Sequence, residues 1–145
     1  MNDIFYKMKV AGLERNLPIN KLTDEMCFAA FIIFGDVELT CACARELIKR
    51  VPEHDIMVTA EAKSIPLIHE MARQSGAEKY FLARKGPKAY MSGVFEVHVK
   101  SITTMDVQRL VIDTADAELI KGKRILIVDD VISTGESLRA MEELV

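Results

Sequence analysis

The chain has 145 residues, of which 50% are hydrophobic and 28% charged, and its formal net charge is −3 at pH 7. This composition excludes an intrinsically disordered chain and predicts one folded domain over residues 1–145. The acidic balance argues against nucleic-acid binding, and the absence of an apolar run of about 18 residues argues against a membrane-spanning helix. The N-terminal MNDIFYKMKVAG lacks the pattern of a secretory signal, so we expect a cytoplasmic protein.

The three cysteines, Cys27, Cys41 and Cys43, are an odd number, which argues against a disulfide framework. On a helix, side chains two residues apart point about 200° away from each other, so Cys41 and Cys43 are a poor metal-binding pair. We therefore interpret all three as small buried apolar side chains in a reduced protein.

The N-terminal third is predicted to be helical. Residues 24–34 (DEMCFAAFIIF) and 37–49 (VELTCACARELIK) are predicted helices separated by a break at Gly35, with Asp24 and Asp36 as first-turn or capping acids. These two helices would make residues 1–50 a mainly helical segment.

The middle of the chain alternates between strands and helices. Residues 55–60 (DIMVTA) are a predicted buried strand, 65–76 a helix that ends at Gly76, and 79–85 (KYFLARK) a second strand. Residues 90–112 contain two alternating stretches around TTMD (103–106), which predicts a hairpin or long β-arm.

The C-terminal part continues this order. KGKR (121–124) is a predicted turn, 125–129 a strand, and GESLRAMEELV (135–145) a helix. Strands separated by helices form βαβ units, so we predict an α/β fold with a mostly parallel central sheet flanked by helices.

The stretch RILIVDDVISTGES (124–137) combines a strand end with a possible phosphate site. Ligands of open α/β sheets bind beyond the carboxyl ends of the strands, where Asp129 and Asp130 stand. Their carboxylates can accept hydrogen bonds from sugar hydroxyls, or hold Mg²⁺ directly or through water. The hydroxyls and backbone N–H groups of residues 133–137 can bind a phosphate at a helix start, and Gly135 allows close approach. The pattern therefore indicates a ribose 5-phosphate.

The segment ILIVDDVISTGES (125–137) resembles the signature of the type I phosphoribosyltransferases, which use 5-phosphoribosyl 1-pyrophosphate (PRPP). The resemblance implies that the β-arm is a hood over the active site. It also implies Mg²⁺ as the cofactor, held by Asp129 and Asp130 through water or ribose hydroxyls. The residues expected to bind the ribose and its 5-phosphate are Asp129, Asp130, Ser133, Thr134, Gly135, Glu136 and Ser137.

Two further segments are similar to the same family. TAEAKSIPL (59–67) resembles its pyrophosphate loop, which often holds a cis peptide, expected here at Ala62–Lys63, and LARKGPK (82–88) resembles the purine branch. The implied catalytic residues are Asp129, Asp130 and Lys63. The implied pyrophosphate-binding residues are Glu61, Ala62, Lys63, Ser64, Arg84, Lys85 and Lys88. The alternative for Arg84, Lys85 and Lys88 is that they are solvated charges at a strand end.

The resemblance implies transfer of the 5-phosphoribosyl group from PRPP to a purine base by a homodimer, without nucleic acid or membrane as partner. Adenine is the favoured base because the whole motif set looks like adenine phosphoribosyltransferase-like proteins. KSITT (100–104) looks more like xanthine enzymes, which leaves xanthine as the alternative. Adenine enzymes often have a Glu in the arm where Thr103 or Thr104 stands, and Ser133 replaces an Asp of the hypoxanthine/guanine branch.

Three other expectations accompany this interpretation. A regulator on the same fold that binds PRPP without turnover is the alternative from another functional class. ERNLPI (14–19) resembles the family more weakly. Within this segment, Arg15 lies either near the base or on the surface. Family members usually continue beyond the phosphate-loop helix, so we expect the chain, which stops at Val145, to be truncated at its C-terminal end.

Overall fold

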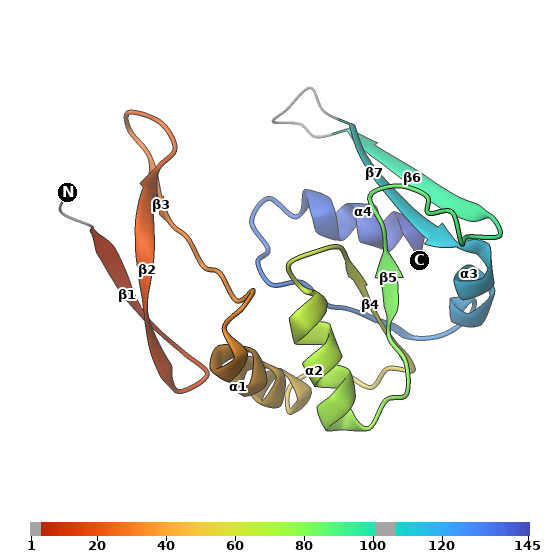
Figure 1. The fold of residues 1–145 in the computed structure, drawn as a ribbon, viewed down its shortest axis with the longest axis horizontal. Coiled ribbons are helices and arrows are strands. Elements are labelled where there is room, and N and C mark those ends of the chain that lie inside the picture. The colour runs from red at the N-terminus through yellow and green to blue at the C-terminus, as the bar shows by residue number, and fades with distance from the viewer. Residues whose placement is uncertain (1–3, 101–106) are drawn as a thin grey trace.

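The structure, a computed structural model, describes residues 4–100 and 107–145. In this part of the chain the strands form three sheets, ordered β1-β2-β3, β5-β4-β8 and β6-β7. Figure 1 shows the β1–β3 sheet at one end of the molecule and the β6–β7 hairpin at the other, with the parallel sheet and its helices between them. A search of the described residues finds no helix that could span a membrane.

The N-terminal sheet is antiparallel and replaces part of the predicted helical segment. Its strands are β1 (Phe5–Val10), β2 (Leu13–Lys21) and β3 (Cys27–Ala29). The predicted helix over 24–34 is wrong, because residues 22–25 are bends and β3 then pairs with β2. Periodicity alone does not distinguish a short apolar run in a strand from one in a helix, and here the pairing with β2 decides.

The predicted helix over 37–49 is confirmed as α1 (Val37–Ile48). Asp36 is its N-cap, and its carboxylate accepts a hydrogen bond of 3.0 Å from the N–H of Leu39. The Arg15 guanidinium on β2 donates to both oxygens of the same carboxylate, at 2.6 and 3.1 Å. This bidentate pair ties the N-terminal sheet to the first helix, so Arg15 has a structural partner.

The three cysteines are free, but only Cys43 is buried, and Cys27 is exposed on β3. The expectation of three buried side chains is therefore wrong for Cys27. Cys41 is half-buried on α1.

The central sheet is parallel, with β4 (Ile56–Ala60) between β5 (Phe81–Ala83) and β8 (Ile125–Ile127). Both faces of β4 are buried. Met57 packs in a core with α1 and with α2 (Ile65–Ser75), while Val58 packs with the hairpin and α4 (Glu136–Leu144). Helices on both faces explain why these strands are short continuous apolar runs, and the predicted α/β class is confirmed.

The predicted β-arm is the hairpin of β6 (Val94–Lys100) and β7 (Val107–Asp113), and its TTMD segment lies outside the described residues. The backbones of Arg84 and Val111 exchange hydrogen bonds of 2.7 and 2.8 Å, which attach β7 beside the end of β5. α4 packs against both strands of the hairpin. Between the hairpin and the turn at 121–124, where no element was predicted, the chain forms α3 (Thr114–Ile120).

The Arg15–Asp36 pair predicts a stability effect. Replacing Asp36 by alanine removes both the helix cap and the partner of Arg15, so we expect the free energy of unfolding at pH 7 to fall by about 2 kcal/mol. Asp36→Asn keeps a capping oxygen and should lose less. Glu38→Gln is the matched control, because Glu38 also contacts Arg15 but is exposed, so its loss should stay below about 0.5 kcal/mol.

The same pair sets the pH dependence of this effect. Hydrogen bonds from Arg15, and then from the N–H of Leu39, hold the pKa of Asp36 below its ordinary value of 3.8. A depressed pKa in the folded state stabilises the protein above the unfolded-state value and loses that contribution as the pH falls through the folded-state value. Urea unfolding at pH 7, and at the lowest pH where the wild type stays folded, should show the Asp36→Ala penalty shrinking on acidification. A penalty that is equal at both pH values, or no penalty at pH 7, contradicts the assignment.

Candidate active site

The candidate site lies where the three parallel strands end. The chain leaves β4 into residues 61–64, β5 into residues 84–88, and β8 through Val128 into Asp129 and Asp130. Because carboxyl ends of parallel strands meet at one edge of a sheet, three loops that are distant in sequence converge there.

One buried hydroxyl joins the two carboxylates. Ser64 is 2% exposed, and its Oγ lies 2.8 Å from Asp129 Oδ1 and 3.2 Å from Asp130 Oδ1. The hydroxyl has a single proton, so it can donate fully to only one carboxylate at a time. The backbone N–H of Asp130 also donates to the Asp129 carboxylate at 2.9 Å.

This arrangement holds two like charges close together. Burial raises the pKa of Asp129, the hydrogen bond from Ser64 partly offsets this, and the neighbouring Asp130 raises it further. The pair is therefore a site for a group that stabilises negative charge, such as sugar hydroxyls or a cation.

A cavity of about 450 Å³ opens beside the pair. Five of the seven residues predicted to bind pyrophosphate line it, namely Glu61, Ala62, Lys63, Ser64 and Lys85. The other two, Arg84 and Lys88, are not among its lining residues. Arg109 and Leu110 of β7 complete a wall of the cavity, so the β-arm borders this site, in agreement with the hood that the resemblance implies.

Arg84 is directed to protein partners instead. Its Nη1 donates to the Glu61 carboxylate at 3.1 Å, and its Nη2 donates to the Tyr90 hydroxyl at 2.9 Å. The other Glu61 oxygen accepts the backbone N–H of Lys85 at 2.7 Å. Glu61 therefore links the loop after β4 to the loop after β5. The cis peptide lies at Glu61–Ala62, one residue before the expected Ala62–Lys63.

The predicted phosphate loop encloses a small hollow of about 30 Å³ at the start of α4. Gly135 is the N-cap of this helix, with a φ of 82°, a conformation that favours glycine. The predicted residues Asp129, Ser133, Thr134, Gly135, Glu136 and Ser137 line this hollow. The positive end of the helix dipole favours an anion at this position.

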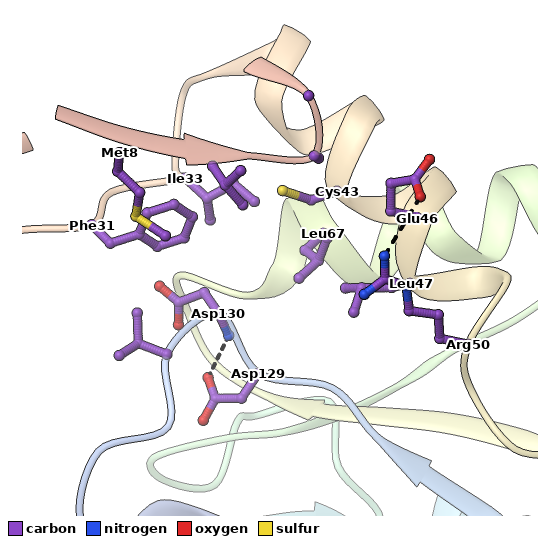
Figure 2. A pocket seen from close by; sticks show the side chains of 14 residues that line it. Met8, Phe31, Ile33, Cys43, Glu46, Leu47, Arg50, Leu67, Asp129 and Asp130 are labelled. Carbon is purple, nitrogen blue, oxygen red and sulfur yellow. Dashed lines mark hydrogen bonds and ion pairs between the residues drawn. The ribbon is translucent and has the colours of Figure 1, made fainter. Parts of the chain in front are cut away.

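A third cavity, of about 810 Å³, lies on the other side of the carboxylates, between the N-terminal sheet and α1 (Figure 2). Met8, Phe31 and Ile33 form its apolar wall, and Asp129 and Asp130 form its polar edge. None of these apolar residues was predicted to line the site. The alternation of Met8 and Val10 along β1 was a signal that this strand has one apolar face. The resemblance left open whether Arg15 lies near the base or on the surface. In the structure Arg15 pairs with Asp36 and Glu38, and it does not line this cavity.

The carboxylate pair also fits Mg²⁺. Among the described residues no group of three or more His, Cys, Asp or Glu side chains could form a closed metal site. Mg²⁺ commonly takes one or two carboxylates and fills its other positions with water and phosphate oxygens. Asp129 and Asp130, which face the cavities, have the chemistry for that kind of shared site.

Comparison with solved structures finds two adenine phosphoribosyltransferases among the matches. The one from Thermoanaerobacter pseudethanolicus aligns with a TM-score of 0.63 and 16% identity, over 97% of this chain and 74% of that chain. The one from Saccharomyces cerevisiae, solved with D-2,5-dideoxy-2,5-imino-altritol 1,6-bisphosphate and adenine, aligns with a TM-score of 0.67 and 19% identity, over 97% and 75%. At this identity the likeness establishes the fold, which is that of the type I phosphoribosyltransferases.

Comparison with curated proteins gives no significant match. The family model described as the phosphoribosyl transferase domain matches residues 39–145, which include the carboxylate pair and all three converging loops. This chain therefore belongs to the phosphoribosyl transferase domain family.

Proposed function

We propose that the protein transfers the 5-phosphoribosyl group of PRPP to a purine base and releases pyrophosphate. The observation that carries this proposal is the position of Asp129, which lines all three cavities of the site. In PRPP one ribose carries the 5-phosphate at C5 and the pyrophosphate at C1, and C1 is also the atom that the base attacks. A sugar bound at Asp129 would reach a separate cavity with each of these groups.

Each cavity has the chemistry of one substituent. The loop over residues 133–137 would bind the 5-phosphate at the start of α4. Lys63 and Lys85, with the amides of the loop after β4, would bind the pyrophosphate. The apolar cavity with Phe31 and Met8 would accept a flat base next to C1.

The chemistry is a displacement at C1 of the ribose. The bond between C1 and the pyrophosphate oxygen breaks, and the pyrophosphate leaves with the electron pair. A ring nitrogen of the base forms the new bond to C1, and the proton that the base loses passes to water. Lys63 and Lys85 stabilise the negative charge that develops on the leaving oxygen, while the carboxylates orient the ribose hydroxyls. Mg²⁺, when bound at Asp129 and Asp130, would neutralise charge on the pyrophosphate and ribose oxygens.

Adenine is the base we propose first. The yeast structure with a similar fold was solved with adenine and an imino-altritol bisphosphate, which supports a purine in the corresponding site here. Xanthine is the second candidate. The residues that suggested it, KSITT (100–104), and the Thr103 and Thr104 that stand in place of an arm glutamate, extend into the segment outside the described residues.

We further propose that residues 1–145 act as one domain, in a cytoplasmic homodimer. A groove beside α1 and α2 supports a second copy, because its edge exposes the apolar side chains of Phe34 and Val37. Burial of such side chains against a partner is favourable. Light scattering should give a mass twice that of the chain, and a monomer mass would contradict this part of the proposal.

The base specificity predicts the outcome of a panel assay. We expect pyrophosphate release from PRPP and Mg²⁺ to be fastest with adenine, slower with xanthine, and negligible with hypoxanthine, guanine and orotate. The measurement is the initial rate for each base at matched concentration. Saturable PRPP binding without turnover of any base would contradict the enzyme and indicate the regulator.

The carboxylate pair predicts opposite effects on activity and stability. Asp129→Asn or Asp130→Asn should lower kcat/KM by about 100-fold or more, because the charge that orients the ribose and Mg²⁺ is lost. Asp129→Asn should also raise the free energy of unfolding by about 0.5–1 kcal/mol, because it removes one of two neighbouring like charges. Asp24→Asn, at a remote exposed carboxylate, is the control and should change neither quantity. An unchanged rate in both site variants would remove the pair from the reaction.

A further inference from the structure

An arginine that the motifs do not include lines the polar cavity. Arg109 lies on β7, well separated in sequence from each of the three loops, yet it lines the same cavity as Lys63 and Lys85. Its side chain is 40% exposed, so it is accessible to a ligand and not part of the core.

The backbone around Arg109 is fixed. The next three residues, Leu110, Val111 and Ile112, are all buried, and Val111 is hydrogen-bonded to Arg84 beside the end of β5. In the hairpin Arg109 pairs with His98. Arg109 is therefore presented to the cavity from a strand whose register is set by the core.

With Arg109 included, the cavity wall has as many cationic as anionic side chains. Among its described lining residues, the cations are Lys63, Lys85 and Arg109, and the carboxylates are Glu61, Asp129 and Asp130. Without Arg109 the carboxylates would outnumber the cations at a site that has to accept a highly charged anion. The guanidinium is thus one of three groups that make the cavity acceptable for phosphate oxygens.

A carboxylate on the neighbouring strand holds the guanidinium. Arg109 Nε donates to Glu96 Oε2 at 2.9 Å, and its Nη2 contacts the same oxygen. The other Glu96 oxygen lies 3.0 Å from His98 Nε2. A guanidinium has five N–H donors, and the Nη1 group lies outside the Glu96 contact. Glu96 can therefore orient Arg109 without using all of its donors.

We propose that Arg109 is a further binding residue for the pyrophosphate group of PRPP and that Glu96 is its positioning residue. This inference rests on the proposed function. Pyrophosphate is the substituent that fits, because a planar guanidinium can bind two phosphate oxygens at once, and because Arg109 lines the cavity of Lys63 and Lys85 and not the apolar one.

The test measures the binding of three ligands to the full chain by calorimetry with Mg²⁺: PRPP, inorganic pyrophosphate and ribose 5-phosphate. Arg109→Ala should weaken PRPP and pyrophosphate binding by about 10- to 100-fold and leave ribose 5-phosphate within about twofold. Arg109→Lys, which keeps the charge but not the fork, should give an intermediate loss. Arg45→Ala, an exposed arginine on α1 outside this cavity wall, is the matched control and should bind all three ligands like the wild type.

Glu96→Gln separates binding from a structural role. It removes the negative charge beside Arg109 but keeps a side-chain oxygen that can still accept from the guanidinium, so Arg109 stays oriented and PRPP binding should stay equal or become about twofold tighter. A merely structural ion pair would instead make Arg109→Ala and Glu96→Gln weaken all three ligands alike, and that result overturns the proposal. Unchanged pyrophosphate binding in Arg109→Ala overturns it as well.

The wild type separates this proposal from the proposed function. If the wild type binds pyrophosphate but not PRPP, the proposed function fails, and the role of Arg109 is tested by the affinity for pyrophosphate alone. If the wild type binds neither, both proposals fail.

Discussion

The candidate site depends on the contact between the Ser64 hydroxyl and two adjacent carboxylates. Ser64 is the N-cap of α2 and is buried, so the position of that helix on β4 determines where Asp129 and Asp130 lie. Two neighbouring carboxylates at a partly buried strand end are unfavourable without a partner. The fold tolerates them because β8 is held in the sheet by β4 and the serine donates from across the strand end.

The three cavities around this contact come from separate parts of the fold. The parallel sheet and its loops supply the polar cavity and the small hollow at the start of α4, whereas the apolar cavity needs the N-terminal sheet, which Arg15 and Asp36 attach to α1. A family domain matched from residue 39 onward therefore includes the charged chemistry, and the preceding strands supply much of the apolar wall. The charged end and the apolar end of the site are therefore built by different segments of the chain.

The parts that sequence predicted well are those with a local pattern. β4, α2, the hairpin and α4 have short apolar runs, a glycine stop or strict alternation, and the DDVISTGES loop carries its chemistry in adjacent residues. The helix over 24–34 was wrong because CFAAFIIF has no polar face to reveal its period. α3 was missed because Asp113, its cap, is also the last residue of β7. Arg109 and Phe31 could not be predicted, since only the tertiary fold brings them to the loops.

The attachment of the β-arm has a consequence for sequence drift. The link between β5 and β7 consists of two main-chain hydrogen bonds, from Arg84 N–H to Val111 C=O and from Val111 N–H to Arg84 C=O. Every residue except proline has the same main-chain N–H and C=O groups, so substitution of either residue by any amino acid other than proline leaves the donors and acceptors intact. The attachment of the arm can therefore persist while the side chains around it are exchanged.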